Sequence, residues 1–361
     1  MEALVFLDEE KGGEKTKEKV VVGMLITALL MSVFGIAFKI APVHAQVVWS
    51  VPGNGTLFNV VTALAGPNDH IHVMAGWVEA LPAPLNIWQN NLAIIGAPPA
   101  MGPTPIIQLT GTPIIITGTG VLIWGLNIVD IGPPTAVGIQ LIPPSSNCII
   151  WGNTITGVAP GTIGIQVLSN TNQIVLNQMS TWGICIDIAD STGNIVKGNI
   201  INPPYNIGIQ VSGGAGLNQI YYNNLLGPPG LWDANPAGSP PNAFDDTFLS
   251  LMGAIVGPSG GPSLNKGNYE IAWANPAPYM IPPLTNGYMD FWPFAVPWVQ
   301  LSGDINVDGA DNIFDIVWVA VNFGDVWCTI TWEPRCDTNG DGVIDIFDIV
   351  FVALNFGAID P

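Results

Sequence analysis

Two twelve-residue segments near the end of the chain carry side-chain oxygens at matching positions. The first runs from Asp304 to Asp315 and the second from Asp337 to Asp348. A hard cation takes roughly six to eight oxygen ligands, which loops of this kind supply from positions 1, 3, 5, 9 and 12 and from the carbonyl at position 7, with a glycine at position 6 for the sharp turn. Both segments fill every one of these positions. The spacing therefore predicts two Ca²⁺ sites.

The predicted ligands are the side chains at positions 1, 3, 5, 9 and 12 and the carbonyl oxygen at position 7. They are Asp304, Asn306, Asp308, Ala310, Asn312 and Asp315 in the first segment and Asp337, Asn339, Asp341, Val343, Asp345 and Asp348 in the second. The second set contains more carboxylates than the first, and ligand charge tunes the affinity of such loops. We therefore expect tighter binding at the second site, and we expect the ions to stabilise a module that is too small to fold by packing alone.

Each segment runs into nearly the same apolar stretch, Ile-Val-Trp-Val-Ala-Val-Asn-Phe-Gly in the first copy and Ile-Val-Phe-Val-Ala-Leu-Asn-Phe-Gly in the second. The two segments start 33 residues apart, and position 12 is Asp rather than Glu. Over residues 301–361 this arrangement resembles the type I dockerin family. The resemblance implies a small α-helical, calcium-binding domain that docks onto a cohesin-like scaffold or surface protein.

Positions 10 and 11 depart from the pattern of many dockerins, which carry a Ser-Thr pair there for recognition of cohesin. Here they are Ile313 and Phe314 in the first copy and Ile346 and Phe347 in the second. A helix that is apolar almost all round cannot bury every face against its twin, and an exposed apolar patch usually marks an interface. We therefore expect these four residues to contact the partner, whose surface should be apolar.

The middle of the chain repeats with a period of 22 to 24 residues. Two features recur with this period: an asparagine, and a short segment similar to Gly-Ile-Gln-Val. The asparagines are Asn153, Asn177, Asn199 and Asn223. Each period is too short for crossover helices, so strands one period apart must stack in parallel as a right-handed β-helix. We expect the turn asparagines to adopt left-handed backbone and to form side-chain ladders. An inward aliphatic column should contain Ile150, Ile174, Val196 and Ile220.

Residues 55–130 resemble the opening of many secreted β-helix proteins. They contain a short helix-like segment from Thr56 to Leu64, a strand that begins at Ile71 and another from Leu92 to Gly96. On these segments the chain is similar to the pectate-lyase-like superfamily, and closest to the branch that includes periplasmic copper-site maturation proteins and carbohydrate-binding or sugar-hydrolase members. The fold class expected is mainly β: a right-handed parallel β-helix with a small α-helical, calcium-binding, dockerin-like C-terminal domain. The expected parts are 1–45 (signal), 46–227 (β-helix), 228–300 (irregular cap and linker) and 301–361 (dockerin-like).

The first 45 residues have the features of an export signal. Three lysines precede a nineteen-residue apolar run from Val20 to Phe38, and the small-residue site Val-His-Ala ends at Ala45. We expect cleavage after Ala45 and an extracellular protein. The alternative is a retained membrane anchor, because the run is just long enough to span a bilayer.

The mature chain would keep 3 basic and 21 acidic residues, a net charge of −18. Nucleic acid is excluded as a partner, because almost no basic residues are left to displace phosphate counterions. In β-helix lyases, which this body resembles, Arg or Lys abstracts the proton. The body has only Lys197 and Lys266, and its charge repels polyuronate, so a lyase is disfavoured.

A glycoside hydrolase would use paired carboxylates. The candidates are Asp187 and Asp190, with Asp130 and Asp233 nearby in the order of the repeats. The histidine and Arg-x-Lys that the resemblance implies late in the helix do not occur here. The alternative is that Asp187 and Asp190 form turns. The body has two histidines, His70 and His72, which share one face of the first predicted strand. Two histidines without a third ligand do not make a metal site. We expect them at a solvated N-terminal edge.

Alignment of the repeats places aromatic residues at one outward position, with each level about 4.8 Å above the last. Flat aromatic side chains at such intervals could stack on sugar rings. The predicted sugar contacts are Trp124, Trp151 and Tyr221, in a column that also contains Ile95, Val175 and Lys197. The alternative is that the cap, residues 228–300, covers this column.

Four cysteines in an exported chain could pair. Cys328 and Cys336 flank the connection between the two calcium segments, and we expect a disulfide bond there. The pairing of Cys148 and Cys185 stays open, with buried free thiols as the alternative.

Two functions remain after these steps. The first is a secreted protein that attaches to a cohesin-like partner, with a body directed at polysaccharide through binding or hydrolysis of glycosidic bonds. The second is a non-enzymatic surface or adhesion module that is anchored through the same tail. The scarcity of basic and histidine residues favours the second.

Overall fold

The computed structural model describes residues 46–359, except 135, 203–206, 227–230, 234–268, 271–278, 281–288, 291–300 and 330. The predicted export signal, residues 1–45, and most of the predicted cap and linker, residues 228–300, lie outside the described residues. No helix in the described part of the chain is long and apolar enough to cross a membrane.

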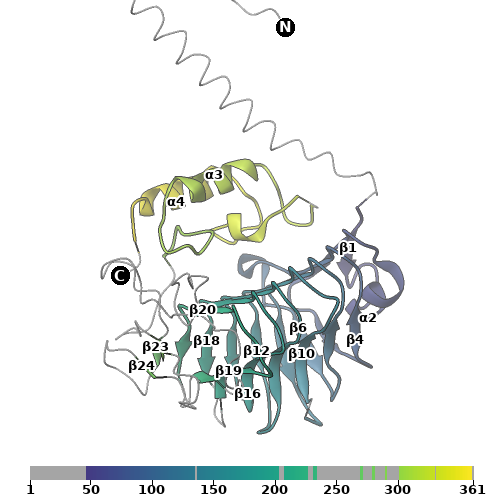
Figure 1. Cartoon of the computed structure of the whole chain (residues 1–361). Helices are drawn as coiled ribbons and strands as arrows, with labels where there is room; N and C mark the ends of the chain where they lie inside the picture. The colour runs from purple at the N-terminus through teal and green to yellow at the C-terminus, as the bar shows by residue number, and fades with distance from the viewer. Residues whose placement is uncertain are drawn as a thin grey trace, which may run out of the picture. The chain divides into compact units, whose positions relative to one another are not determined.

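Three parallel sheets form the body, because each turn of the chain adds a strand to each sheet (Figure 1). Sheet A contains β1 (Val48–Val51), β2 (His70–Val73), β5 (Ala93–Gly96), β8 (Leu122–Trp124), β11 (Ile149–Trp151), β14 (Gln173–Val175), β17 (Ile195–Lys197) and β20 (Gln219–Tyr221). Sheet B contains β3 (Val78–Ala80), β6 (Ile106–Leu109), β9 (Asn127–Asp130), β12 (Thr154–Thr156), β15 (Gln178–Ser180), β18 (Ile200–Asn202), β21 (Asn224–Leu225) and β23 (Tyr269–Glu270). Sheet C contains β4 (Leu85–Ile87), β7 (Ile114–Ile116), β10 (Val137–Leu141), β13 (Ile163–Val167), β16 (Ile184–Ala189), β19 (Ile207–Ser212) and β22 (Leu231–Asp233).

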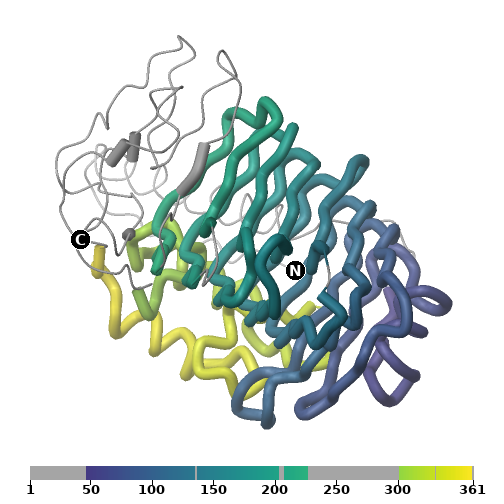
Figure 2. Tube along the Cα trace, turned by 90° about the horizontal axis from the view of Figure 1, so that it is seen from below, coloured from purple at the N-terminus to yellow at the C-terminus, as the bar shows by residue number. Residues whose placement is uncertain are grey.

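Successive turns of the chain stack side by side along the body, as Figure 2 shows. This arrangement confirms the predicted parallel β-solenoid, whose right-handed sense remains an expectation from the connection rule. The solenoid continues beyond residue 227, where the sequence repeat faded, because β22 pairs with β19 and β23 pairs with β21. Backbone pairing needs no particular side chain, so the repeat could not mark these last strands. Two further short strands, β24 (Tyr279–Met280) and β25 (Met289–Asp290), form an antiparallel pair.

The interior of the solenoid is filled with aliphatic side chains in register. Ile150, Ile174, Val196 and Ile220 pair from strand to strand and are fully buried, which confirms the predicted column. Full burial of such a side chain contributes about 1.5–3 kcal/mol. At the N-terminal end, α2 (Leu57–Asn59) and the π-helical turn η1 (Val60–Leu64) confirm the predicted helical segment, and the 3₁₀ turn η2 (Pro99–Met101) follows β5.

Asparagine side chains form a ladder at the corner between sheets A and B. The side-chain amides of Asn153, Asn177 and Asn199 each donate to the Oδ1 atom of the next asparagine at 3.1, 3.1 and 2.9 Å. The ladder is as predicted, but the left-handed residue is not the asparagine. It is the preceding residue, such as Leu176 with φ 54°, because the chain must turn there for the asparagine to point inward and accept the backbone N–H of the neighbouring turn.

Glycines of the second repeat make room for one buried indole. Trp182 lies inside the solenoid and donates from Nε1 to the carbonyl oxygen of Ile155 at 3.3 Å. A Cβ atom on Gly138 would lie 3.0 Å from the ring, and one on Gly164 would lie 3.1 Å from it and 2.6 Å from Met179. The glycine repeat is therefore partly a packing requirement of this side chain.

The tail, residues 301–359, contains α3 (Ile313–Val321), the 3₁₀ turn η4 (Pro334–Cys336) and α4 (Ile346–Asn355). Helices α3 and α4 contact each other and bury Val319 and Val352. All four cysteines are free thiols, so the predicted bond between Cys328 and Cys336 is wrong. The Sγ atom of Cys336 lies instead 3.5 Å from the carbonyl oxygen of Trp318, in the core of the tail.

Candidate functional site

The two acidic loops of the tail have the same internal hydrogen bonds. The position-1 carboxylate of Asp304 accepts N–H groups from Asp308 at 3.0 Å and Gly309 at 2.8 Å. Asp337 accepts the equivalent bonds in the second loop at 3.1 and 2.8 Å. The position-6 glycines, Gly309 and Gly342, adopt φ values of 92° and 88°, which favour glycine. The predicted sharp turn is therefore present in both loops.

The position-12 carboxylate closes each loop onto its helix. Asp315 accepts the backbone N–H of Ile305 at 2.9 Å and that of the N-cap residue Asn312 at 2.8 Å. In the second loop Asp348 makes the corresponding bonds at 2.8 Å with Thr338 and the N-cap Asp345. Helices α3 and α4 thus begin with capping boxes, which stabilise a helix N-terminus.

The loops concentrate negative charge in buried positions. Asp304, Asp315 and Asp348 are fully buried. Burial raises the pKa of Asp304 and of Asp337 to about 6. Among the described residues, no three His, Cys, Asp or Glu side chains converge as a metal site, because these carboxylates face the loop amides. The available donors are all oxygens, which suit a hard cation and not copper or zinc.

Helices α3 and α4 expose matching apolar side chains. Phe314 is 68% exposed and Phe347 is 66% exposed, while Val321 and Leu354 at the far end of the two helices are 69% and 80% exposed. The predicted interface residues Ile313 and Ile346 are also exposed to the same extent as each other, and so are Val317 and Val350. The duplication in sequence has thus become a duplicated apolar surface, which we call the helix face. Contiguous exposed apolar surface is unusual on a soluble chain.

The predicted outward column of sheet A is in register, but the tail covers much of it. Its members are Ile95, Trp124, Trp151, Val175, Lys197 and Tyr221. Ile95 packs in one cluster with Trp327 and Trp332 of the tail, and Trp332 meets Trp124 edge-on at 5.6 Å. The described contacts come from the tail and not from residues 228–300, because the tail presents aromatic side chains that match this surface. The column is therefore not an open platform for sugar along its whole length.

Arg335 fixes the connection between the two loops on the aromatic surface. Its guanidinium lies over the rings of Trp318 at 4.4 Å and Trp151 at 5.1 Å. It also donates to both carboxylate oxygens of Glu333 at 2.7 and 2.8 Å. A planar guanidinium can stack on a ring and bind a carboxylate in its own plane at once.

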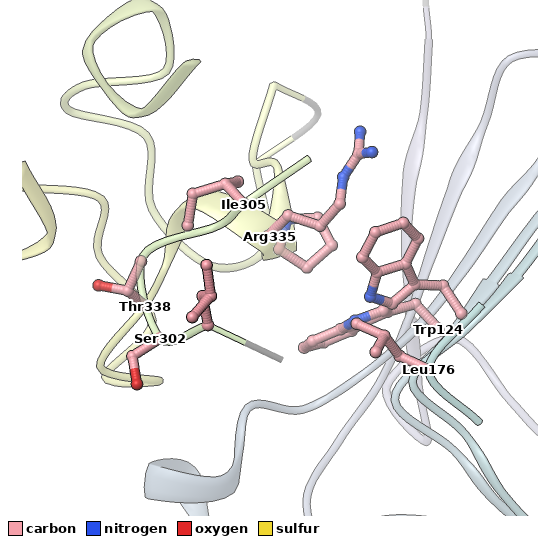
Figure 3. A pocket seen from close by; sticks show the side chains of 9 residues that line it. Trp124, Leu176, Ser302, Ile305, Arg335 and Thr338 are labelled. Carbon is pink, nitrogen blue, oxygen red and sulfur yellow. The ribbon is translucent and has the colours of Figure 1, made fainter. Parts of the chain in front are cut away.

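A pocket of about 260 Å³ remains beside these rings, between body and tail. Figure 3 shows Trp124 and Leu176 of the body on one side and Ile305, Ser302 and Thr338 of the tail on the other. The remaining lining residues are Trp151, Leu301, Pro334 and Arg335. The pocket thus combines indole surface with hydroxyl groups.

The first loop makes polar and apolar contacts with sheet A. Lys197 donates from Nζ to the carbonyl oxygens of Asn306 at 3.3 Å and Val307 at 2.9 Å. The side chain of Val307 is fully buried in one cluster with Trp151 and Val175. Val307 has a φ of 57°, a left-handed conformation that costs about 1–2 kcal/mol for a residue with a Cβ.

His70 and His72 share one face of β2, as predicted, and their rings stack at 6.1 Å. The predicted solvated edge is wrong for His72, which is fully buried against Trp327 at 4.4 Å. Burial lowers the pKa of His72 to about 3, with a smaller contribution from His70. No hydrogen-bond partner reaches either ring nitrogen of His72 in the described part of the chain.

Asp187 lies on strand β16 of sheet C and Asp190 in the turn that follows it, and neither residue lines the pocket beside Trp124. Asp187 is 5% exposed and accepts hydrogen bonds from Gln166 at 3.1 Å and Ser212 at 3.2 Å, and burial raises its pKa. Asp190 adopts a left-handed turn with φ 50°, as the turn-former alternative predicted. Asp130 belongs to sheet B, and the side chain of Asp233 lies outside the described residues.

Residues 134–228 match the family described as periplasmic copper-binding protein (NosD). They contain no histidine, and their two cysteines, Cys148 and Cys185, are buried. No curated protein matches the chain.

Two solved structures are similar. One is a pectin methylesterase variant in complex with a hexasaccharide, at 12% identity over 64% of this chain and 78% of that chain, with a TM-score of 0.35. The other is an alginate lyase from Paenibacillus sp. str. FPU-7, at 17% identity over 55% of this chain and 97% of that chain, with a TM-score of 0.29. Similarity this low carries no inference about the activity of this chain.

Proposed function

We propose that the tail is a calcium-binding, dockerin-like attachment module that joins an extracellular β-solenoid to a cohesin-like partner. The observation that carries this proposal is the duplication in three dimensions. Both loops have the same carboxylate hydrogen bonds, both lead into capped helices, and both helices expose the same apolar positions. A chance acidic turn would not reproduce all three features twice.

The calcium part of the proposal follows from the donor set. Asp304 and Asp337 are buried carboxylates, and burial raises the pKa of both to about 6 because it disfavours the charged form. An ion bound by the six predicted positions of each loop would neutralise this charge. The ion supplies charge neutralisation and ligand geometry, and the loop residues hold the helices α3 and α4 in the arrangement that presents the helix face.

The partner part of the proposal follows from the chemistry of the helix face. It exposes the aromatic side chains of Phe314 and Phe347, each preceded in the chain by an exposed isoleucine, Ile313 or Ile346. Buried aromatic side chains at the centre of an interface usually dominate binding energy. We therefore expect a partner with an apolar groove, and not one that recognises the Ser-Thr pair of other dockerins.

The test uses the full chain immobilised in Ca²⁺ or in EDTA, a panel of recombinant type I cohesins, and extract of the source culture with identification of captured proteins by mass spectrometry. We expect capture of a cohesin-like domain in Ca²⁺ only. The double variant Phe314→Asp with Phe347→Asp should lose at least 100-fold in affinity, because it buries two unpaired charges. Val158→Asp, at an exposed valine of the body, is the control. Capture that is indifferent to EDTA or to the double variant would contradict the proposal.

A second function, binding of polysaccharide by the body, is favoured by the pocket beside Trp124 and Trp151. Indole rings with nearby hydroxyls suit the apolar face and the hydroxyl edge of a sugar. The volume of about 260 Å³ is slightly below the range of roughly 300–1,000 Å³ for drug-sized ligands, so the pocket fits a single terminal sugar ring. We propose binding and not hydrolysis, because Asp187 is engaged by neighbours and Asp190 forms a turn.

Saturation-transfer NMR with a panel of neutral monosaccharides and uronic acids tests this second function. We expect signals from at least one sugar, lost in Trp124→Ala and kept in Trp88→Ala, where the indole is exposed elsewhere on the body. Equal signals in the two variants, or none in the wild type, would remove this function.

A further inference from the structure

We infer that the outward face of sheet A is a binding surface for the first calcium loop, so that the body and the tail dock onto each other when this loop adopts its calcium-binding conformation. This inference deepens the proposed function, because it rests on the first loop being a calcium loop. It follows from a difference between two loops that are otherwise alike.

The difference lies at position 4 of the loops. Both loops place this residue in the left-handed region, with φ 71° at Gly340 and φ 57° at Val307. Glycine adopts this conformation without strain, whereas a β-branched residue rarely does. The first loop thus carries a strained residue where its duplicate carries the expected one.

The body explains why a side chain is present at this position. Val307 is fully buried, and it packs with Trp151, Val175 and Tyr222 of the solenoid. Every other residue of this cluster belongs to the solenoid. Strain that persists at one residue is offset by the contacts that the residue makes, and here those contacts belong to sheet A.

Lys197 adds a polar contact between sheet A and the first loop. It donates to the carbonyl oxygens of positions 3 and 4, whereas the predicted ligand carbonyl is at position 7, Ala310. The ammonium group of Lys197 and the proposed Ca²⁺ ion would therefore not compete for the same carbonyl oxygen. The positive charge of Lys197 opposes the ion at longer range, so the neutral residue Val307 provides the cleaner test.

The second loop also approaches the body, through small residues. A Cβ atom on Gly342 would lie 2.8 Å from Met101, and one on Gly340 would lie 3.7 Å from Pro99. Trp327, whose backbone N–H donates to the carbonyl oxygen of Gly342 at 2.7 Å, meets the ring of His72. Both loops are thus held in the junction, while the helix face stays exposed.

Coupling follows from this geometry. Sheet A contacts the backbone of the first loop in the conformation that the proposed ion would also require. Calcium binding and docking of the tail should therefore favour the same loop conformation. Removal of calcium should release the tail and expose the aromatic column. The helix face would then lose its fixed orientation relative to the body.

The test is hydroxyl-radical footprinting of the full chain, read by mass spectrometry at Trp151, with Trp182 inside the solenoid as a folding control. Val307→Gly installs the residue of the second loop, which relieves strain in the tail but removes the docking side chain. Val326→Gly removes an exposed valine from the tail outside both calcium loops, as the matched control.

We expect oxidation of Trp151 to rise at least threefold in Val307→Gly, and in wild type with EDTA, while Val326→Gly in Ca²⁺ stays at the wild-type level. Lys197→Met should give a rise in the same direction. Unchanged protection of Trp151 in Val307→Gly would overturn the inference. A parallel Ca²⁺ titration distinguishes failure of this inference from failure of the proposed function. Two bound ions per chain with unchanged oxidation of Trp151 would contradict only the docking. No bound ion in wild type would contradict the proposed function.

Discussion

Asp311 shows at the scale of one residue how the two loops differ. It occupies position 8 of the first loop, where the second loop has the buried Ile344. Asp311 is 1% exposed, and neither of its carboxylate oxygens has a hydrogen-bond partner among the described residues. A buried polar group without a partner costs about 1–3 kcal/mol.

Asp311→Leu should therefore raise the free energy of unfolding by about 1–3 kcal/mol, because the branched side chain is kept and the charge is removed. The reciprocal variant Ile344→Asp should lower it. Urea unfolding of the full chain measures both changes. A loss of stability in Asp311→Leu would show that the carboxylate is satisfied in solution.

His72 predicts a pH dependence of stability. Its pKa in the folded chain is about 3, against 6.5 for an ordinary histidine. As the pH falls below about 6.5, the unfolded chain takes up a proton that the folded chain does not, so stability is lost by up to about 1.4 kcal/mol per pH unit. Above that pH the contribution is fully present. Urea unfolding between pH 7 and pH 4 should show a shallower loss for His72→Phe than for wild type. Equal slopes would mean that His72 is protonated in the fold.

At the scale of elements, the glycine repeat is required by packing on one side of the solenoid. A Cβ atom on Gly164 would lie 2.7 Å from the carbonyl oxygen of Cys185, which cannot move without its strand. Gly164→Ala should destabilise the chain by about 1–3 kcal/mol. Gly66→Ala is the control, because its Cβ would meet only Asp69 at 3.7 Å. Thermal unfolding compares the two, and equal midpoints would contradict this packing.

The strands and both helices of the tail could be predicted from the sequence, because a 22–24-residue period and a duplicated loop are local patterns. The register of the outward column followed from the same alignment. What covers that column could not be predicted. The contact of Lys197 with Val307 joins residues 110 positions apart, and no repeat records it. The burial of His72 was missed for the same reason, since its cover, Trp327, belongs to the tail.

At the scale of the whole molecule, charge and attachment are linked. The mature chain would carry a charge of −18, part of it in the two buried loops, and each proposed ion removes two of these charges. Occupancy at a hundredfold over the dissociation constant stabilises by about 2.7 kcal/mol per site. The tail would thus be most ordered in calcium-rich surroundings outside the cell, where its partner is expected.

The stoichiometry of calcium binding by the full chain tests this account most directly. Titration against a competing chelator dye should give two ions per chain for wild type and one for either Asp304→Asn or Asp337→Asn, with the tighter site lost in the latter. The same single substitution at Asp325, which is half-buried and lies outside both loops, should leave both ions bound. A wild-type chain that takes up no calcium at millimolar concentration would contradict the account at its foundation.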